Sequence, residues 1–121
     1  MSKNIIQLEK LLRMNLYLIF SKPEASKEEI KSLLQEHLQN QVRLEREGVL
    51  FGAGPVFDES GEPVCGMFIL RADSFEAARA IADRDPLHRA GLRSYTIQRW
   101  LMNEGSLSMT VRFSDQSAIV E

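Results

Sequence analysis

The chain has 121 residues, enough for one domain with a single modest hydrophobic core. Apolar residues make up 44% and charged residues 26%, proportions that do not indicate a disordered, fibrous or membrane-spanning chain. The formal net charge of −2 disfavours nucleic acid as a partner, because phosphate binding needs a dense basic face.

The N-terminal part predicts a leader, a strand and a long helix. Residues 1–13 are expected to form a leader that is either disordered or a short amphipathic helix. The apolar residues of 15–20 predict a strand directly after it. Ser26 and Glu29 then form a capping box, which predicts a helix over about 27–47.

A β-hairpin is predicted after that helix. Gly48 is placed to end the helix, and residues 49–57 predict a second strand that is bent at its glycines and proline. Turn-forming residues fill 58–63, and residues 64–71 predict a third strand paired with the second.

A second helix and a fourth strand complete the predicted domain. Asp73 or Ser74 caps the helix, which extends to about Arg84, and residues 95–101 predict the strand. The order β-α-β-β-α-β is typical of the ferredoxin-like α+β fold, in which helices cover one face of a four-stranded antiparallel sheet.

The last segment, residues 103–121, lies beyond this pattern. Its alternation of apolar and polar residues predicts an extra C-terminal β-hairpin with one apolar face. The helices of a ferredoxin-like fold leave the other face of the sheet bare, so we expect the hairpin to pack there or on a second subunit. A homodimer or higher homo-oligomer is therefore expected.

Two titratable residues fall on the apolar faces of the predicted helices. His37 points between Leu33 and Leu34, near the centre of the first helix's apolar stripe. Asp85 follows the second helix at helical spacing, just before Pro86 ends it. A carboxylate at a helix C-terminus is unfavourable against the dipole, and burying it unpaired costs several kcal/mol or so. An imidazolium facing Asp85 would offset both the dipole effect and the cost of burial, so we predict a His37–Asp85 pair.

Several short motifs occur in the order and spacing of a known family. These are Glu36-His37-Leu38, Leu44-Glu45-Arg46-Glu47-Gly48-Val49-Leu50, Ala53-Gly54-Pro55, Asp73-Ser74-Phe75-Glu76-Ala77-Ala78, Ala82-Asp83-Arg84-Asp85-Pro86 and Ala90-Gly91. Over about residues 14–102 the chain resembles the YciI-like (YCII-related) family. The resemblance implies a small ferredoxin-like homodimer, similar to the dimeric α/β-barrel enzymes.

The resemblance also implies site residues. Carried over by position, the family's proposed His–Asp pair is His37 with Asp85, and one branch of the family is associated with dehydrochlorination in aromatic catabolism. The chain departs from the family at Leu34, where an Arg is common, and at Cys65-Gly66, where a Gly-Ser pair is common. These departures imply a different substrate.

The pair favours acid–base chemistry without a cofactor. An imidazole with a pKa of about 6.5 exchanges protons near neutral pH, and a carboxylate on its second nitrogen fixes the tautomer. The sequence contains no recognisable nucleophile, Walker, dinucleotide or H-E-x-x-H motif. We therefore predict an isomerase or lyase for a small anionic or carbonyl-bearing metabolite, with His37 as the base and Asp85 orienting it.

Four further residues are predicted to bind substrate: Gln41, Gly54, Pro55 and His88. Gln41 follows His37 by one helical turn, and Gly54 with Pro55 would let a ligand approach the backbone. His88 is open to three interpretations, as the true partner of Asp85, a second pocket residue or an exposed loop histidine. A metal site of both histidines and Asp85 has no supporting spacing, so no metal or cofactor is expected.

A second class of function also fits these residues. The protein could be a non-catalytic dimeric module for a small ligand or an interaction partner, with His37–Asp85 as a structural pair. The single Cys65 excludes an intrachain disulfide, and no apolar run is long enough to span a membrane. A cytoplasmic location is expected.

Overall fold

The computed structural model describes residues 5–121 and divides into two compact units. One unit is Asn15–Leu101, and the other is formed by the two chain ends, up to Met14 and from Met102.

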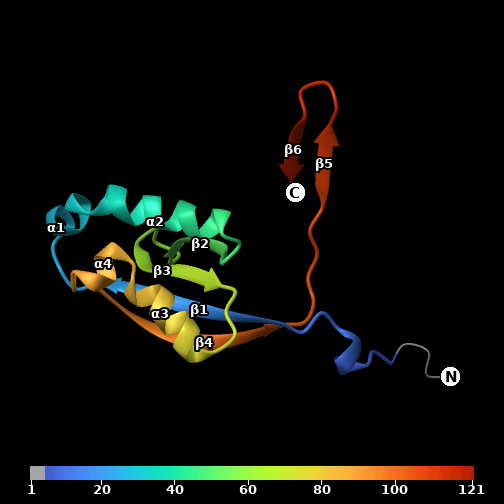
Figure 1. Ribbon diagram of the computed structural model, residues 1–121, viewed down its shortest axis with the longest axis horizontal. Helices are drawn as coiled ribbons and strands as arrows, with labels where there is room; N and C mark the ends of the chain where they lie inside the picture. Colours follow the sequence, from blue (N-terminus) through green and yellow to red (C-terminus); the bar gives the residue numbers. More distant parts are fainter. Residues whose placement is uncertain (1–4) are drawn as a thin grey trace. The chain divides into compact units, whose positions relative to one another are not determined.

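The central unit is an α+β domain built on one sheet (Figure 1). Its elements are β1 (Met14–Pro23), α1 (Lys27–Ser32), α2 (Leu34–Arg46), β2 (Leu50–Phe57), β3 (Pro63–Leu70), α3 (Phe75–Asp83), α4 (Pro86–Arg89) and β4 (Arg93–Met102). The four strands follow the order β2-β3-β1-β4, and β3 pairs antiparallel with both β1 and β2. This confirms the predicted ferredoxin-like fold.

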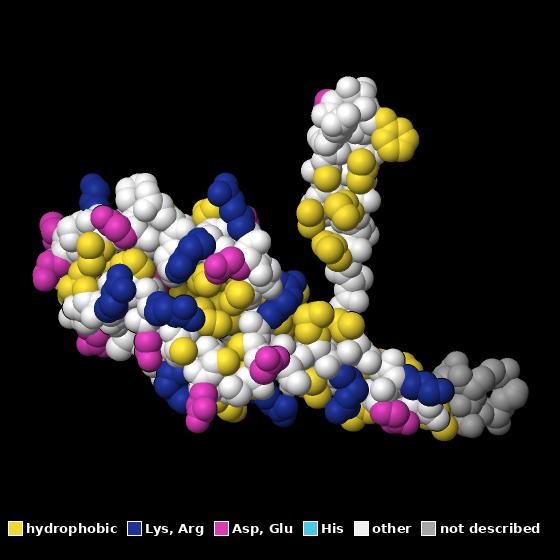
Figure 2. All heavy atoms as spheres, viewed as in Figure 1, with side chains coloured by type: hydrophobic (Ala, Val, Ile, Leu, Met, Phe, Trp, Pro, Cys, Tyr) yellow, Lys and Arg dark blue, Asp and Glu magenta, His cyan; other side chains and the backbone are white. Residues whose placement is uncertain are grey.

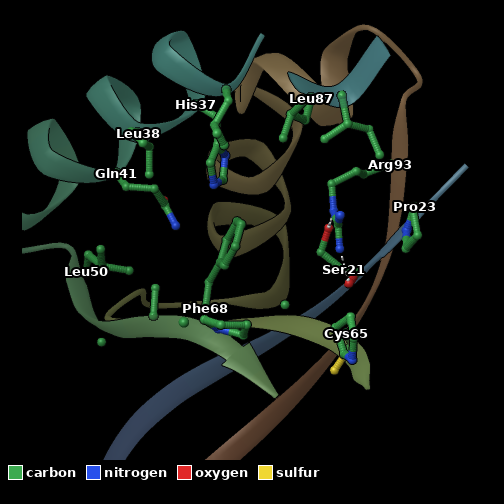
Figure 3. A pocket seen from close by; sticks show the side chains of 18 of the residues that line it. Ser21, Pro23, His37, Leu38, Gln41, Leu50, Cys65, Phe68, Leu87 and Arg93 are labelled. Atoms are coloured by element: carbon green, nitrogen blue, oxygen red, sulfur yellow. Dashed lines mark hydrogen bonds between the residues drawn. The ribbon is translucent and has the colours of Figure 1, made fainter. Parts of the chain in front are cut away.

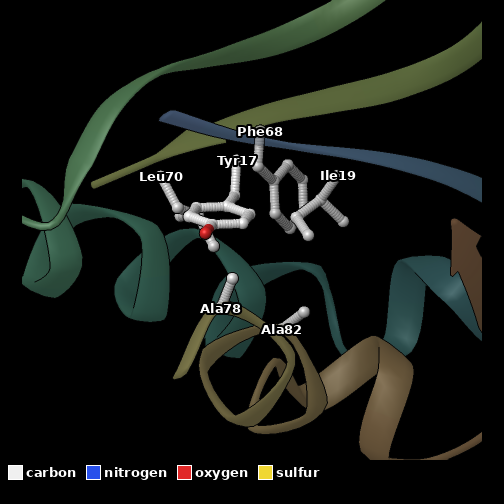
Figure 4. Close-up of a cluster of buried hydrophobic side chains, with 6 residues drawn as sticks. All are labelled: Tyr17, Ile19, Phe68, Leu70, Ala78 and Ala82. Carbon is white, nitrogen blue, oxygen red and sulfur yellow. The ribbon is translucent and has the colours of Figure 1, made fainter. Parts of the chain in front are cut away.

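The core lies between the sheet and α3 (Figure 4). Buried side chains of β1 and β3 pack against the small residues Ala78 and Ala82 of α3. The strand residues of this cluster are Tyr17, Ile19, Phe68 and Leu70. Alanine side chains are short, so a helix face made of them can pack directly against the side chains of the sheet.

The helix predicted over 27–47 is interrupted at Leu33. The capping box is present as expected, since the Ser26 hydroxyl accepts from the Glu29 N–H at 3.1 Å. Leu33 leaves helical geometry at φ −113° and ψ 11°. The Ser32 hydroxyl donates to the Glu29 carbonyl at 2.5 Å, a side-chain bond that competes with the helix backbone and favours a bend.

Two strands are longer than predicted, with a consequence for the site. β1 continues to Pro23 instead of ending at residue 20, and β4 begins at Arg93 instead of at residue 95. The additional residues bring Ser21 and Arg93 into the sheet.

The chain ends form the second unit. In its described N-terminal part the leader has one 3-10 turn, η1 (Leu8–Lys10), while the expectation for residues 1–4 lies outside the described residues. β5 (Met109–Arg112) and β6 (Ser117–Val120) pair antiparallel, which confirms the predicted C-terminal hairpin. Apolar side chains are exposed along it (Figure 2). No helix in the described part of the chain is both long and apolar enough to cross a bilayer.

Candidate active site

A cavity of about 810 Å³ opens within the central unit (Figure 3). α1 and α2 form one side of it, and β2 and β3 form the other. Apolar side chains such as Leu34, Leu38, Leu50, Phe68 and Leu87 supply much of its wall. A largely apolar cavity with a few polar groups is typical of a small-molecule site.

His37 projects from α2 into this pocket, above the ring of Phe68 (Figure 3). The two ring centroids lie 5.9 Å apart. The Nδ1 atom of His37 lies 2.7 Å from Oδ2 of Asp85. Because an ionised carboxylate can only accept, Nδ1 carries the proton of this hydrogen bond. In the neutral imidazole the lone pair is then on Nε2.

Asp85 directly follows Arg84, the C-cap of α3, but it also begins the next helix. Its carboxylate is the N-cap of α4, because Oδ1 accepts from the Leu87 N–H at 2.9 Å and Pro86 takes the first helical position. An acid is favourable at a helix N-terminus, so the predicted conflict with the dipole is wrong. Asp85 is 1% exposed, and His37 is its ion-pair partner.

The pKa of Asp85 reflects opposing effects. Desolvation by burial raises it, but the hydrogen bond and the charge of His37, together with the Leu87 N–H, outweigh burial. The pKa of this carboxyl is therefore below its ordinary value of 3.8, and the group is ionised at neutral pH.

His88 lies in α4 and is neither an exposed loop residue nor part of the pocket wall. Its Nδ1 is 2.8 Å from the Ala82 carbonyl, and its Nε2 is 2.8 Å from the Ser21 hydroxyl. Both ring nitrogens therefore have partners other than Asp85, and Asp85 binds His37, so the interpretation of His88 as the partner of the acid is wrong. Its predicted contact with substrate lacks support from this position. Within residues 5–121 no three potential ligands gather as a metal site.

The other predicted binding residues line the pocket. Gln41 points into it from α2, and its buried Oε1 has no hydrogen-bond partner within residues 5–121 (Figure 3). Gly54 and Pro55 line it from β2. A Cβ atom at Gly54 would meet nothing within 4 Å, so the missing side chain leaves open space over the backbone.

Among the polar residues of the pocket wall that sequence reasoning missed are Ser21 and Arg93, which contact each other. Arg93 donates from Nε to the Ser21 hydroxyl at 2.9 Å and from Nη2 to the Ser21 carbonyl at 2.7 Å. Desolvation by burial lowers the pKa of Arg93, while the charge of Asp85 opposes this effect. The sequence does contain a signal for Ser21. Every second side chain of β1 faces the core, and Ser21 follows Tyr17 and Ile19 at this spacing.

The sheet order and the histidine–carboxylate pair at a helix–sheet pocket define a small ferredoxin-like α+β protein with one candidate acid–base site. The chain belongs to the YCII-related domain family, whose model matches residues 14–101. It is similar in fold to 5-chloro-2-hydroxyhydroquinone dehydrochlorinase from Burkholderia phenoliruptrix AC1100, solved as a complex with 2,5-dihydroxybenzoquinone. The identity is 21%, the TM-score is 0.58, and the match covers 70% of this chain and 92% of that one. No protein with a curated description matches the chain.

Proposed function

We propose that the protein is a cofactor-independent lyase that acts on a small, carbonyl-bearing or hydroxylated ring. His37 is the base and Asp85 is the residue that positions it. The observation that carries this proposal is the 2.7 Å contact between His37 Nδ1 and Asp85 Oδ2 at the pocket. A buried carboxylate in this position fixes the tautomer of the base and stabilises the imidazolium formed when Nε2 accepts a proton.

In the proposed step the ring reacts as a keto tautomer, in which the carbon that carries the leaving group is tetrahedral, and Nε2 of His37 takes a proton from a carbon next to the carbonyl. The electron pair left behind moves into the ring and expels a leaving group, such as chloride, from a neighbouring carbon. The substrate loses one proton and one anion, and the ring gains a double bond. No electron acceptor is needed, because both electrons of the broken bond depart with the leaving group.

We propose elimination instead of isomerisation because the structural relative catalyses an elimination. That protein is a dehydrochlorinase and binds a dihydroxylated quinone. An isomerase would share the first proton transfer and return the proton at another carbon. The proposal also retains two predictions from the sequence, a homodimeric state and a cytoplasmic location.

Chloride release tests the activity directly. We expect the wild-type protein, treated with EDTA and kept without oxygen to prevent oxidation of the ring, to release chloride from 5-chloro-2-hydroxyhydroquinone in proportion to enzyme concentration. Ion chromatography measures the chloride, and absorbance follows the quinone product. Because the chain departs from its family at three pocket-lining residues, Leu34, Cys65 and Gly66, a panel of other chlorinated hydroxyquinols is assayed in parallel.

The control is the same assay without protein and with His37→Asn. Binding of panel members without any chloride release above these controls would contradict the lyase proposal. It would favour the non-catalytic ligand-binding module instead.

A further inference from the structure

Arg93 is held rigidly at one end of the pocket. Its Nε and Nη2 atoms both donate to Ser21, at 2.9 Å and 2.7 Å, so two hydrogen bonds fix the plane of the guanidinium. Figure 3 shows the two side chains together at the edge of the cavity. A fixed, planar set of donors is suited to binding an anionic oxygen.

The Ser21 hydroxyl is itself held in one orientation. The Ala82 carbonyl can only accept, so Nδ1 of His88 carries a proton, and Nε2 of the neutral ring accepts from Ser21. The Ser21 oxygen then accepts from Arg93. This chain of hydrogen bonds gives His88 and Ser21 a common role, which is to support the guanidinium.

The guanidinium of Arg93 makes no ion pair within residues 5–121, and the nearby carboxylate of Asp85 is already bound to His37. Among residues 5–121 the only ion pair is that of His37 with Asp85. Arg93 is half-buried, and the wall of the same pocket includes the apolar side chains of Phe68 and Leu87. A partly desolvated cation beside apolar side chains is unfavourable unless an anion approaches it. The cavity is the side from which such an anion can come.

The space beside the guanidinium is also kept free. Gly66 lines the same part of the pocket, and a Cβ atom built on it would lie 3.8 Å from Nη2 of Arg93. Any longer side chain at this position would occupy the approach to the guanidinium. Glycine therefore leaves the donors of Arg93 accessible from the cavity.

We propose that Arg93 is the subsite for an anionic oxygen of the substrate, which places the substrate among flat organic anions that carry an enolate, phenolate or carboxylate group. This inference rests on the proposed function for the reaction at His37 but concerns binding at Arg93. Arg93 holds the anionic oxygen, Phe68 and Leu87 contact the ring, and His37 reaches the atom that loses the proton. In the elimination, Arg93 also stabilises negative charge that moves onto ring oxygens.

Binding measurements test the subsite without turnover. The probes are 2,5-dihydroxybenzoquinone and benzoate, each compared with an uncharged analogue, 2,5-dimethoxybenzoquinone and benzamide respectively. We expect wild-type protein to bind at least one anion tighter than its neutral analogue by about tenfold or more, with an affinity that falls as salt increases. The two pairs distinguish an enolate site from a carboxylate site. Equal affinity within both pairs would overturn the proposal.

Variants test whether the preference for the anion depends on Arg93. Arg93→Gln is expected to remove the preference for the anion, and Arg93→Lys to retain part of it, because lysine keeps the charge but loses the planar donors. The matched control is Arg99→Gln on the same strand, where the guanidinium is exposed and donates to Asn15. If Arg93→Gln does not fold, the proposal is tested by the affinities of wild type and Arg93→Lys for each anion and its neutral analogue.

The same measurements separate this proposal from the proposed function. His37→Asn should bind the preferred anion as well as wild type does, because Arg93 is intact. Anion preference that depends on Arg93, combined with no chloride release by wild type, supports the subsite and contradicts the lyase. Chloride release that is unchanged in Arg93→Gln supports the lyase and contradicts the subsite.

Discussion

Replacing His37 by Asn should lower kcat for chloride release by about 10²–10⁴-fold in protein that still folds, and it should also lower the melting temperature, because buried Asp85 loses its partner. Asparagine keeps a polar side chain of moderate size on α2 but has no basic nitrogen at the position of Nε2. The proton transfer therefore loses its acceptor. His37 side-chain exposure is 15%, so the substitution also removes a largely buried ring from its packing, and kcat has to be compared per folded molecule. Steady-state kinetics and thermal unfolding give the two readouts.

A neighbouring substitution on the same helix serves as the control. Glu36→Gln changes an exposed carboxylate that does not line the pocket and should leave both kcat and melting temperature unchanged. Retention of wild-type kcat by His37→Asn would show that His37 is not the base. A large fall in melting temperature with the same kcat per folded molecule would assign His37 a structural role.

Asp85→Ala should lower the free energy of unfolding by about 2–4 kcal/mol. The change removes the N-cap of α4 and leaves the Leu87 N–H buried without its acceptor. It also removes the hydrogen-bond partner of His37 Nδ1. Asp85→Asn keeps a side chain that can cap the helix, so its destabilisation should be smaller. Urea unfolding measures both, and exposed Asp73, which does not cap α3, provides the matched control as Asp73→Ala.

The stabilisation by Asp85 should depend on pH in a defined direction. The pKa of this carboxyl is lower in the folded protein than in the unfolded chain, where it is about 3.9. The ionised carboxylate therefore stabilises the fold fully above the unfolded pKa, and this contribution is lost as pH falls through the folded pKa. The stability difference between wild type and Asp85→Asn should shrink from about pH 7 to about pH 3. A difference that is constant over this range would contradict the charged pair.

The positioning role of Asp85 has a separate signature. Nitrogen-15 NMR of the wild-type imidazole should show the neutral His37 with its proton on Nδ1, because the carboxylate accepts it. In Asp85→Asn the amide enforces this tautomer less strongly, so a mixture of tautomers and a lower kcat are expected together. A purely structural role of Asp85 would leave the tautomer of folded His37 unchanged.

The sequence determined the fold class and which histidine pairs with which carboxylate. The capping box at Ser26, the hairpin and the polar–apolar alternation are local signals that depend on a few adjacent residues, so they can be interpreted without the tertiary structure. His37 stood out because a titratable residue on an apolar stripe needs a partner. Asp85 was identified partly for the wrong reason, since Asp followed by Pro also marks the start of a helix.

Only the tertiary structure decided what surrounds the pair. Ser21, His88 and Arg93 come from three elements, and their hydrogen bonds join residues 67 and 72 positions apart in the sequence. Neither their spacing nor their local patterns indicate such contacts, because the contacts depend on the pairing order β3-β1-β4 and on how α4 lies over it. The strand ends that carry Ser21 and Arg93 lay beyond the predicted strands for the same reason. Hydrogen bonding to neighbouring strands sets where a strand ends, and those neighbours are distant in the chain.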